Sequence, residues 1–175
     1  MKTLKGVRSR MKINISKLLR EQERKIEFSG KTECPADLYG TEFTGDAEVS
    51  GYVLDQAGYM TLKASAKLPY RTSCARCSKP LEGVYELQFS KPVAAKGVLQ
   101  NEENDEYVVA VGGEIDFDEL LEDAVILDFP MRMLCKEDCK GLCPRCGKDL
   151  NEGKCGCPEK EIDPRLAKLS KLLDK

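Results

Sequence analysis

The sequence predicts an α+β protein: an antiparallel β-sheet or small, partly open barrel with one packed helix, plus a C-terminal zinc-ribbon-like cysteine module. Alternating apolar residues mark strands, one amphipathic helix follows them, and six of the nine cysteines fall between Cys135 and Cys157. A chain of 175 residues with 41% hydrophobic residues supplies one main core and a small added module. The domains we expect are a basic N-terminal segment (1–25), an α+β core (26–130), a cysteine-rich zinc module (131–160) and a C-terminal helix (161–175).

Apolar residues at period two indicate the strands. In "MTLKASAKLPY" every second residue from Met60 to Tyr70 is apolar and polar residues separate them, as in a half-buried antiparallel strand. Residues 47–53 alternate in the same way, and Gly58 then favours a hairpin around residues 55–58. "GVYELQFS" alternates in the same way, and "EYVVAV" near residue 108 is a short apolar strand. Four or more such strands make a sheet or a small barrel.

Helical signals come later in the chain. Asp116 followed by Glu119 resembles a capping box. An apolar face then follows at helical spacing, made of Phe117, Leu120, Leu121, Ala124 and Val125. We expect this helix to pack on the sheet. Asp163 as N-cap and Pro164 at the first helical position predict the C-terminal helix.

Charge is unevenly distributed along the chain. The segment from Met1 to Lys25 contains nine Lys or Arg residues and only two acidic residues. No Lys or Arg lies between Val98 and Pro130. The basic N-terminal part could therefore bind phosphate groups, whereas the acidic part would repel them. The alternative is that both parts are only solvated surfaces. Residues 99–106 are acidic and apolar-poor, which predicts a mobile loop. Met11 raises the hypothesis that residues 1–10 are a misassigned start.

Several functions are disfavoured by composition. There is no apolar run of the roughly 18 residues that a membrane span needs and no signal-peptide pattern, so we expect a cytoplasmic protein without a membrane partner. There is no histidine, which removes Ser-His-Asp and Cys-His nucleophiles and histidine acid–base chemistry. We therefore predict a non-enzymatic protein with no small-molecule substrate.

The cysteines are spaced for metal binding. In "CPRCG", Cys143 and Cys146 can chelate one tetrahedral ion from a tight turn, and Cys155 and Cys157 of "CGC" return after a short loop to complete it. Zinc is the expected ion. Disulfides are disfavoured because a reducing cytosol keeps thiols reduced and nine is an odd number.

A second, weaker site is formed in this scheme by two remaining pairs. They are Cys74 and Cys77 in "CARC" and Cys135 and Cys139 in "CKEDC". Eight paired cysteines make two zinc sites of four and leave Cys34 alone. Alternatively, the eight cysteines are grouped differently between the sites, or some of them remain reduced thiols that bind no metal. An iron–sulfur cluster also fits four thiolates, although no ferredoxin spacing is present.

Basic residues surround the cysteines. A zinc ion with four thiolates carries a net charge of two minus, so nearby cations are expected on electrostatic grounds alone. They are Arg76, Lys136, Lys140, Arg145, Lys148 and Lys154. Nucleic-acid binding is the competing interpretation, with Arg76, Arg145 and Lys148 as candidate RNA or partner contacts. Tryptophan is absent and aromatics are 6%, so phosphate contacts would dominate RNA binding.

The combined pattern resembles a known family, the bacterial large ribosomal RNA subunit accumulation protein YceD. The resemblance rests on "CARC" after a strand, an acidic helix running into "ILDFP", and the tail "CKEDCKGLCPRCGKDLNEGKCGC", and it extends over roughly residues 11–165. The matching positions are Cys74, Arg76 and Cys77 in the central motif and Cys143, Cys146, Cys155 and Cys157 in the tail. It implies a non-enzymatic cytoplasmic factor needed for accumulation of large-subunit ribosomal RNA. Some relatives lack the tail, which implies a stabilising role for it.

We therefore predict a ribosome biogenesis factor that binds a large-subunit ribosomal RNA precursor, a ribosomal protein, or both, with zinc as structural support. The alternative is a zinc-thiolate redox sensor or redox-regulated chaperone that releases zinc on oxidation. A thiol oxidoreductase fits less well, because neither C-x-x-C motif has the strand–helix context of a thioredoxin.

Overall fold

The computed structural model describes residues 10–35, 37–96 and 106–158. The chain forms two compact units. Unit 1 comprises Met1–Ser73 and Pro80–Met133, and unit 2 comprises Cys74–Lys79 and Leu134–Lys175. The expected C-terminal helix at 161–175 lies outside the described residues. So do residues 1–9 of the hypothesised misassigned start and nearly all of the expected mobile loop at 99–106.

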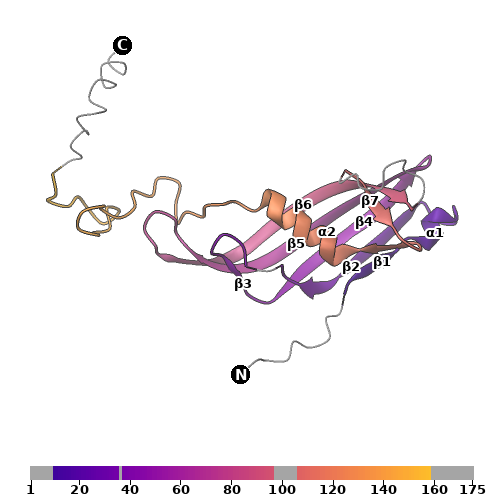
Figure 1. The fold of residues 1–175 in the computed structure, drawn as a ribbon, viewed down its shortest axis with the longest axis horizontal. Helices are drawn as coiled ribbons and strands as arrows, with labels where there is room; N and C mark the ends of the chain where they lie inside the picture. Colours follow the sequence, from indigo (N-terminus) through magenta and orange to yellow (C-terminus); the bar gives the residue numbers. More distant parts are fainter. Residues whose placement is uncertain (1–9, 36, 97–105, 159–175) are drawn as a thin grey trace, which may run out of the picture. The chain divides into compact units, whose positions relative to one another are not determined.

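Unit 1 is built on a six-stranded sheet (Figure 1). Its strands are β2 (Lys25–Glu33), β3 (Glu42–Phe43), β4 (Asp46–Gln56), β5 (Tyr59–Ser73), β6 (Pro80–Ala95) and β7 (Val108–Ala110). The order is β2-β4-β5-β6-β7, and β3 pairs with β5. The predicted antiparallel sheet is confirmed for every pair except β6 and β7, which run parallel. A parallel pair needs a crossover of about a dozen residues, and the chain between Ala95 and Val108 has that length.

The predicted hairpin joins β4 to β5. Gln56 pairs with Tyr59, so the loop has only two residues, Ala57 and Gly58. Their φ angles are 55° and 87°, as a type I′ turn requires. The Gly58 N–H also donates to the Asp55 carboxylate at 2.9 Å. The alternation of Met60 to Tyr70 therefore lies on the central strand of the sheet, where one face is buried.

A small second sheet in unit 1 uses residues from the basic N-terminal segment. Strand β1 (Lys12–Asn14) pairs with β8 (Glu114–Asp116), and the short helix α1 (Ser16–Leu19) follows β1. Ile13, Ile15 and Leu18 are buried in the core. Charged and polar residues of this segment thus alternate with apolar residues that anchor it in the core of unit 1.

Helix α2 (Phe117–Asp128) packs on one face of the sheet, as the sequence predicted (Figure 1). Asp116 is its N-cap and accepts a hydrogen bond from the Glu119 N–H. All five residues of the expected apolar face are buried: Phe117, Leu120, Leu121, Ala124 and Val125. Within the described residues, no helix combines the length and hydrophobicity of a membrane span.

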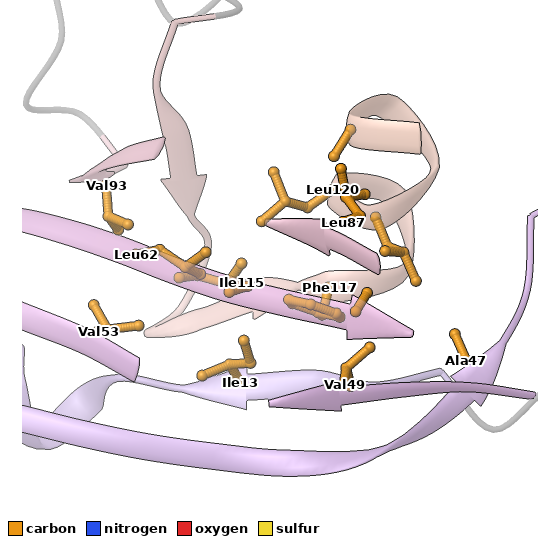
Figure 2. Close-up of a cluster of buried hydrophobic side chains, with 14 of the residues drawn as sticks. Ile13, Ala47, Val49, Val53, Leu62, Leu87, Val93, Ile115, Phe117 and Leu120 are labelled. Carbon is orange, nitrogen blue, oxygen red and sulfur yellow. The ribbon is translucent and has the colours of Figure 1, made fainter. Parts of the chain in front are cut away.

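Phe117 lies at the centre of the core of unit 1 (Figure 2). Its ring is 5.3 Å from that of Phe28 on β2 and 6.2 Å from that of Phe89 on β6, measured between centroids. The side chain has no exposed surface. The Phe117 ring therefore connects helix α2 to two strands, β2 and β6, which lie on either side of the central strands β4 and β5.

Gly51 on β4 provides a test of this packing. A Cβ atom there would meet the Lys63 carbonyl oxygen at a distance well below van der Waals contact, and would lie 2.7 Å from Phe28 and 2.9 Å from the Ala64 Cα. Two of these neighbours are backbone atoms, so the sheet must shift. We expect Gly51→Ala to lower the free energy of unfolding by about 1–3 kcal/mol, measured by urea denaturation.

Gly30 is the matched control, because a Cβ there would make only an ordinary 3.5 Å contact with the Met11 side chain. Gly30→Ala should change the stability by no more than about 0.5 kcal/mol. Equal losses in the two variants would contradict this account of the β4 surface.

Candidate metal centres

Eight of the nine cysteines gather in two groups of four in unit 2, and all nine are free thiols. Cluster I consists of Cys74, Cys77, Cys135 and Cys139, and cluster II consists of Cys143, Cys146, Cys155 and Cys157. Within each cluster the four sulfur atoms lie within 4.8 Å of one another. Cys34 belongs to unit 1 and is half-buried, and burial raises the pKa of its thiol to about 11.

The sulfur spacing of cluster I fits a tetrahedral metal ion. Zinc–sulfur bonds of about 2.3 Å place the four sulfur atoms of a tetrahedral site about 3.8 Å apart. Cys74 Sγ lies 3.8 Å from Cys139 Sγ, and Cys77 Sγ lies 3.6 Å from Cys135 Sγ. Four soft thiolate donors with no oxygen or imidazole among them favour zinc or iron over magnesium or calcium. The two clusters can each bind a metal ion.

A tight turn presents the first two ligands of cluster I. It connects β5 to β6 and reads "CARCSK". The Cys74 N–H donates to the Lys79 carbonyl at 2.8 Å, and the Ser78 N–H donates to the Cys74 carbonyl at 2.9 Å. Ser78 has a φ of 56°, which a non-glycine residue adopts only at a cost.

The same turn occurs in cluster II, with the sequence "CPRCGK". The Cys143 N–H donates to the Lys148 carbonyl at 2.8 Å, and the Gly147 N–H donates to the Cys143 carbonyl at 2.9 Å. Gly147 occupies the position of Ser78, with a φ of 72°. The repeated pattern C-x-R-C-x-K was visible in the sequence, but our sequence analysis did not use it. Comparison of the two hexapeptides would have revealed two equivalent metal-binding turns.

The first thiol of each turn has a lowered pKa. Backbone N–H groups, first that of Cys135 and then those of Cys77 and Arg76, lower the pKa of Cys74 to about 6. Backbone N–H groups of Cys146 and Arg145, followed by the Cys155 side chain, lower the pKa of Cys143 to about 6. Each cluster therefore favours one thiolate at neutral pH, which is the form that binds metal.

The thiols of Cys135 and Cys157 resist ionisation without a cation, because each has a raised pKa. The hydrogen bond with the Cys146 side chain, with desolvation second, raises the pKa of Cys157 to about 12. Four thiolates at this separation repel one another, so full ionisation of a cluster requires a positive ion at its centre.

The candidate RNA contacts differ in their surroundings. The Arg76 guanidinium donates to the Cys139 carbonyl at 2.7 Å, and the Lys148 ammonium donates to the Lys154 carbonyl at 3.2 Å. Both side chains thus bind within unit 2. The Arg145 side chain is exposed and has no ion pair within the described part of the chain. Of the three, Arg145 is therefore the one whose side chain has no hydrogen bond or ion pair within the described residues.

Three residues with contacts around the clusters were missed by the sequence analysis. The Asn151 amide donates to Cys139 Sγ at 3.4 Å. The Lys79 ammonium forms an ion pair with the Asp149 carboxylate at 3.0 Å, which holds the pKa of Lys79 above its usual range. Short polar residues such as Asp149 and Asn151 bond to nearby backbone in many loops. Only the folded chain shows that Asn151 points to a sulfur atom.

The positive φ angles of the two turns predict opposite effects of substitution. Gly147→Ala should destabilise unit 2 by about 1 kcal/mol, because nothing lies within 4 Å of an added Cβ and the cost is purely conformational. Ser78→Gly should stabilise unit 2 by relieving the same strain. Chelator titration with metal release as the readout measures both, and changes of the same sign would contradict the equivalence of the turns.

Comparison with known proteins finds one matching family and several relatives. The chain matches the family "Large ribosomal RNA subunit accumulation protein YceD" over residues 62–173, a range that includes both clusters. An uncharacterized protein of Mycobacterium tuberculosis is 31% identical over 176 residues, 95% of this chain and 83% of the relative. A chloroplastic large ribosomal RNA subunit accumulation protein YCED homolog of Arabidopsis thaliana is 37% identical over 59 residues, 34% of this chain and 18% of that protein. No solved structure matches.

Proposed function

Because this chain belongs to the YceD family of large ribosomal RNA subunit accumulation proteins, we propose that it is a non-enzymatic ribosome biogenesis factor acting in the cytoplasm. It promotes accumulation of large-subunit ribosomal RNA by binding the RNA precursor, a ribosomal protein, or both. The family match over residues 62–173 carries this proposal.

Two zinc ions, one in each cluster, support the fold of unit 2 in this proposal. Four cysteines fill a tetrahedral zinc ion completely, as in structural zinc sites, and leave no position for a substrate or an activated water. Cys74, Cys77, Cys135 and Cys139 would hold one ion. Cys143, Cys146, Cys155 and Cys157 would hold the other. The ions bring folding energy and no reaction step.

RNA contact is proposed for the basic side chains of unit 2, namely Arg76, Arg145 and Lys148. Arg145 is exposed and lies in the C-x-x-C turn of cluster II. Phosphate contacts of this kind give affinity without reading the base sequence. Arg76 and Lys148 would contribute mainly by holding the turns in shape, since both donate hydrogen bonds inside unit 2.

Contact with a basic ribosomal protein is proposed for the outer face of α2. Glu119, Glu122 and Asp123 are exposed there and have no ion pair within the described residues. Ile126 and Leu127 continue the same stripe at helical spacing, with 46% and 78% of their surface exposed. A Lys- or Arg-rich segment with an apolar anchor complements such a face in charge and in hydrophobicity.

Sedimentation in the native host tests the function. We expect tagged full-length protein to sediment with large-subunit precursors, and a deletion strain to contain less large-subunit than small-subunit ribosomal RNA. Arg145→Glu should weaken crosslinking to RNA. The triple variant Glu119→Lys, Glu122→Lys and Asp123→Lys should weaken crosslinking to ribosomal protein.

Lys63→Glu is the control for both, since it changes charge on an exposed strand residue of unit 1 outside the two proposed contacts. If the protein is absent from every precursor fraction and ribosomal RNA is normal in the deletion strain, the proposal is wrong.

A redox sensor or redox-regulated chaperone is the second candidate. The observation that favours it is that each cluster contains an exposed cysteine, Cys135 in cluster I and Cys146 in cluster II. An exposed thiolate is the first to meet an oxidant such as peroxide. Release of metal at low peroxide together with a gain of holdase activity would favour this function, whereas retention of metal under those conditions would exclude it.

A further inference from the structure

Asn151 belongs to the loop of cluster II but contacts a ligand of cluster I. It lies between Cys146 and Cys155 in the sequence. Its side-chain Nδ2 is 3.4 Å from Cys139 Sγ. Cys139 is 1% exposed, so water cannot readily replace this donor. The Cys139 thiolate of one metal site therefore depends on a residue whose position the other site controls.

The orientation of the Asn151 side chain is fixed on every side. Its Oδ1 accepts from the Lys140 N–H at 2.9 Å, which leaves Nδ2 to face the sulfur. The Asp149 carboxylate accepts from the Asn151 backbone N–H at 2.8 Å and from Nδ2 at 2.7 Å. The amide is thus held as a donor toward Cys139 and does not rotate freely.

Further contacts tie the cluster II loop to cluster I. The Leu150 N–H donates to the Gly141 carbonyl at 2.9 Å, and Asp149 pairs with Lys79, which ends the first metal-binding turn. Gly141 has a φ of 74°, and a Cβ atom there would lie 2.9 Å from the Arg76 carbonyl oxygen. This close approach places the segment that leads into cluster II directly against the turn of cluster I.

We infer that the two clusters bind metal cooperatively, and that Asn151 is the positioning residue that couples them. This inference rests on the proposed binding of zinc. An ion in cluster II fixes both ends of the loop that carries Asn151, so its N–H donor is already in place when Cys139 binds the other ion. Hydrogen bonds to metal ligands of this kind change metal affinity by about 10–100-fold. By linkage, an ion in cluster I strengthens cluster II by the same factor.

Metal titration of the full-length protein tests the coupling. Metal-free, reduced protein is titrated with Zn²⁺ against a competing chelator, and with Co²⁺ to follow sulfur-to-metal charge-transfer absorption. Cys135→Ser and Cys155→Ser each leave one complete cluster. We expect the remaining site of each variant to bind its ion about 10-fold more weakly than the wild-type protein does.

Substitution of Asn151 separates a donor role from simple loop support. Asn151→Ala should weaken cluster I and abolish the dependence of each cluster on the other. Asn151→Asp keeps the acceptor for Lys140 but replaces the N–H donor with a negative oxygen facing the Cys139 thiolate. We expect Asn151→Asp to weaken cluster I more than Asn151→Ala does. Because the same Nδ2 also donates to the Asp149 carboxylate, loop support is measured separately, as the change that each substitution makes to the affinity of cluster II in the Cys135→Ser variant. A loss there as large as the loss at cluster I would mean that Asn151 only supports the loop.

Glu137→Gln is the control, because Glu137 lies between two ligands of cluster I, is exposed and does not face a sulfur in the described contacts. It should leave both affinities unchanged. If both single-cluster variants bind their remaining ion as tightly as the wild-type protein, the coupling is absent and the inference is wrong. If the wild-type protein binds neither ion, the zinc proposal itself fails, which is a distinguishable result.

Discussion

Removal of zinc is expected to unfold unit 2 and to leave unit 1 folded. The only buried apolar side chains in the described part of unit 2 are cysteines: Cys74, Cys77, Cys139 and Cys143. The core cluster of aliphatic and aromatic residues lies entirely in unit 1. Structural zinc contributes apparent binding energies of about 10–16 kcal/mol at neutral pH in small zinc domains. Without it, unit 2 has no core to oppose chain entropy.

Hydrogen exchange followed by mass spectrometry measures this effect. With a strong chelator and reductant, amides from residues 134–158 should exchange at the rate of an unfolded chain, and amides of β4 and β5 should keep their protection. Re-addition of Zn²⁺ should restore protection, which controls for damage by the chelator. Unchanged protection of residues 134–158 in demonstrably metal-free protein would contradict a metal-built unit 2.

Phe117→Ala is expected to cause the largest loss among substitutions in unit 1, about 3–5 kcal/mol in the free energy of unfolding. The Phe117 ring is fully buried and contacts Phe28 and Phe89, so its removal leaves a cavity between α2 and the sheet. A loss of this size is comparable to the whole stability of many domains. Urea denaturation followed by circular dichroism measures it.

Leu127→Ala is the matched control on the same helix, because Leu127 is 78% exposed. Its truncation should change the stability by no more than about 0.5 kcal/mol. A small loss in Phe117→Ala, or equal losses in the two variants, would mean that α2 does not hold the sheet through this ring.

Much of unit 1 is predictable because its elements have a strong period. The alternation from Met60 to Tyr70 and the capping residue Asp116 each specify structure within a few neighbouring residues, and both predictions are confirmed. The β1–β8 sheet was not predicted, since three-residue strands are too short to show a period. The parallel pairing of β6 and β7 depends on partners distant in sequence, which local pattern does not encode.

The candidate metal centres show the same division. C-x-x-C spacing identifies pairs of ligands, because two thiols on one turn are a local property. The proposal that Cys74 and Cys77 share a site with Cys135 and Cys139 followed from counting the remaining pairs. The structure places these four sulfur atoms within 4.8 Å of one another, and metal binding by them stays a proposal. The contact of Asn151 with Cys139 had no counterpart in the sequence, since a single asparagine in a loop has many partners available to it.

The metal content of the intact protein tests the central claim most directly. The protein should be purified without a metal-affinity column, added metal or chelators. Its metal content is then measured by elemental analysis and by native mass spectrometry. We expect two zinc ions per chain, with all nine cysteines reduced. One zinc ion per chain, an iron–sulfur cluster, or metal-free protein that keeps unit 2 folded would contradict it.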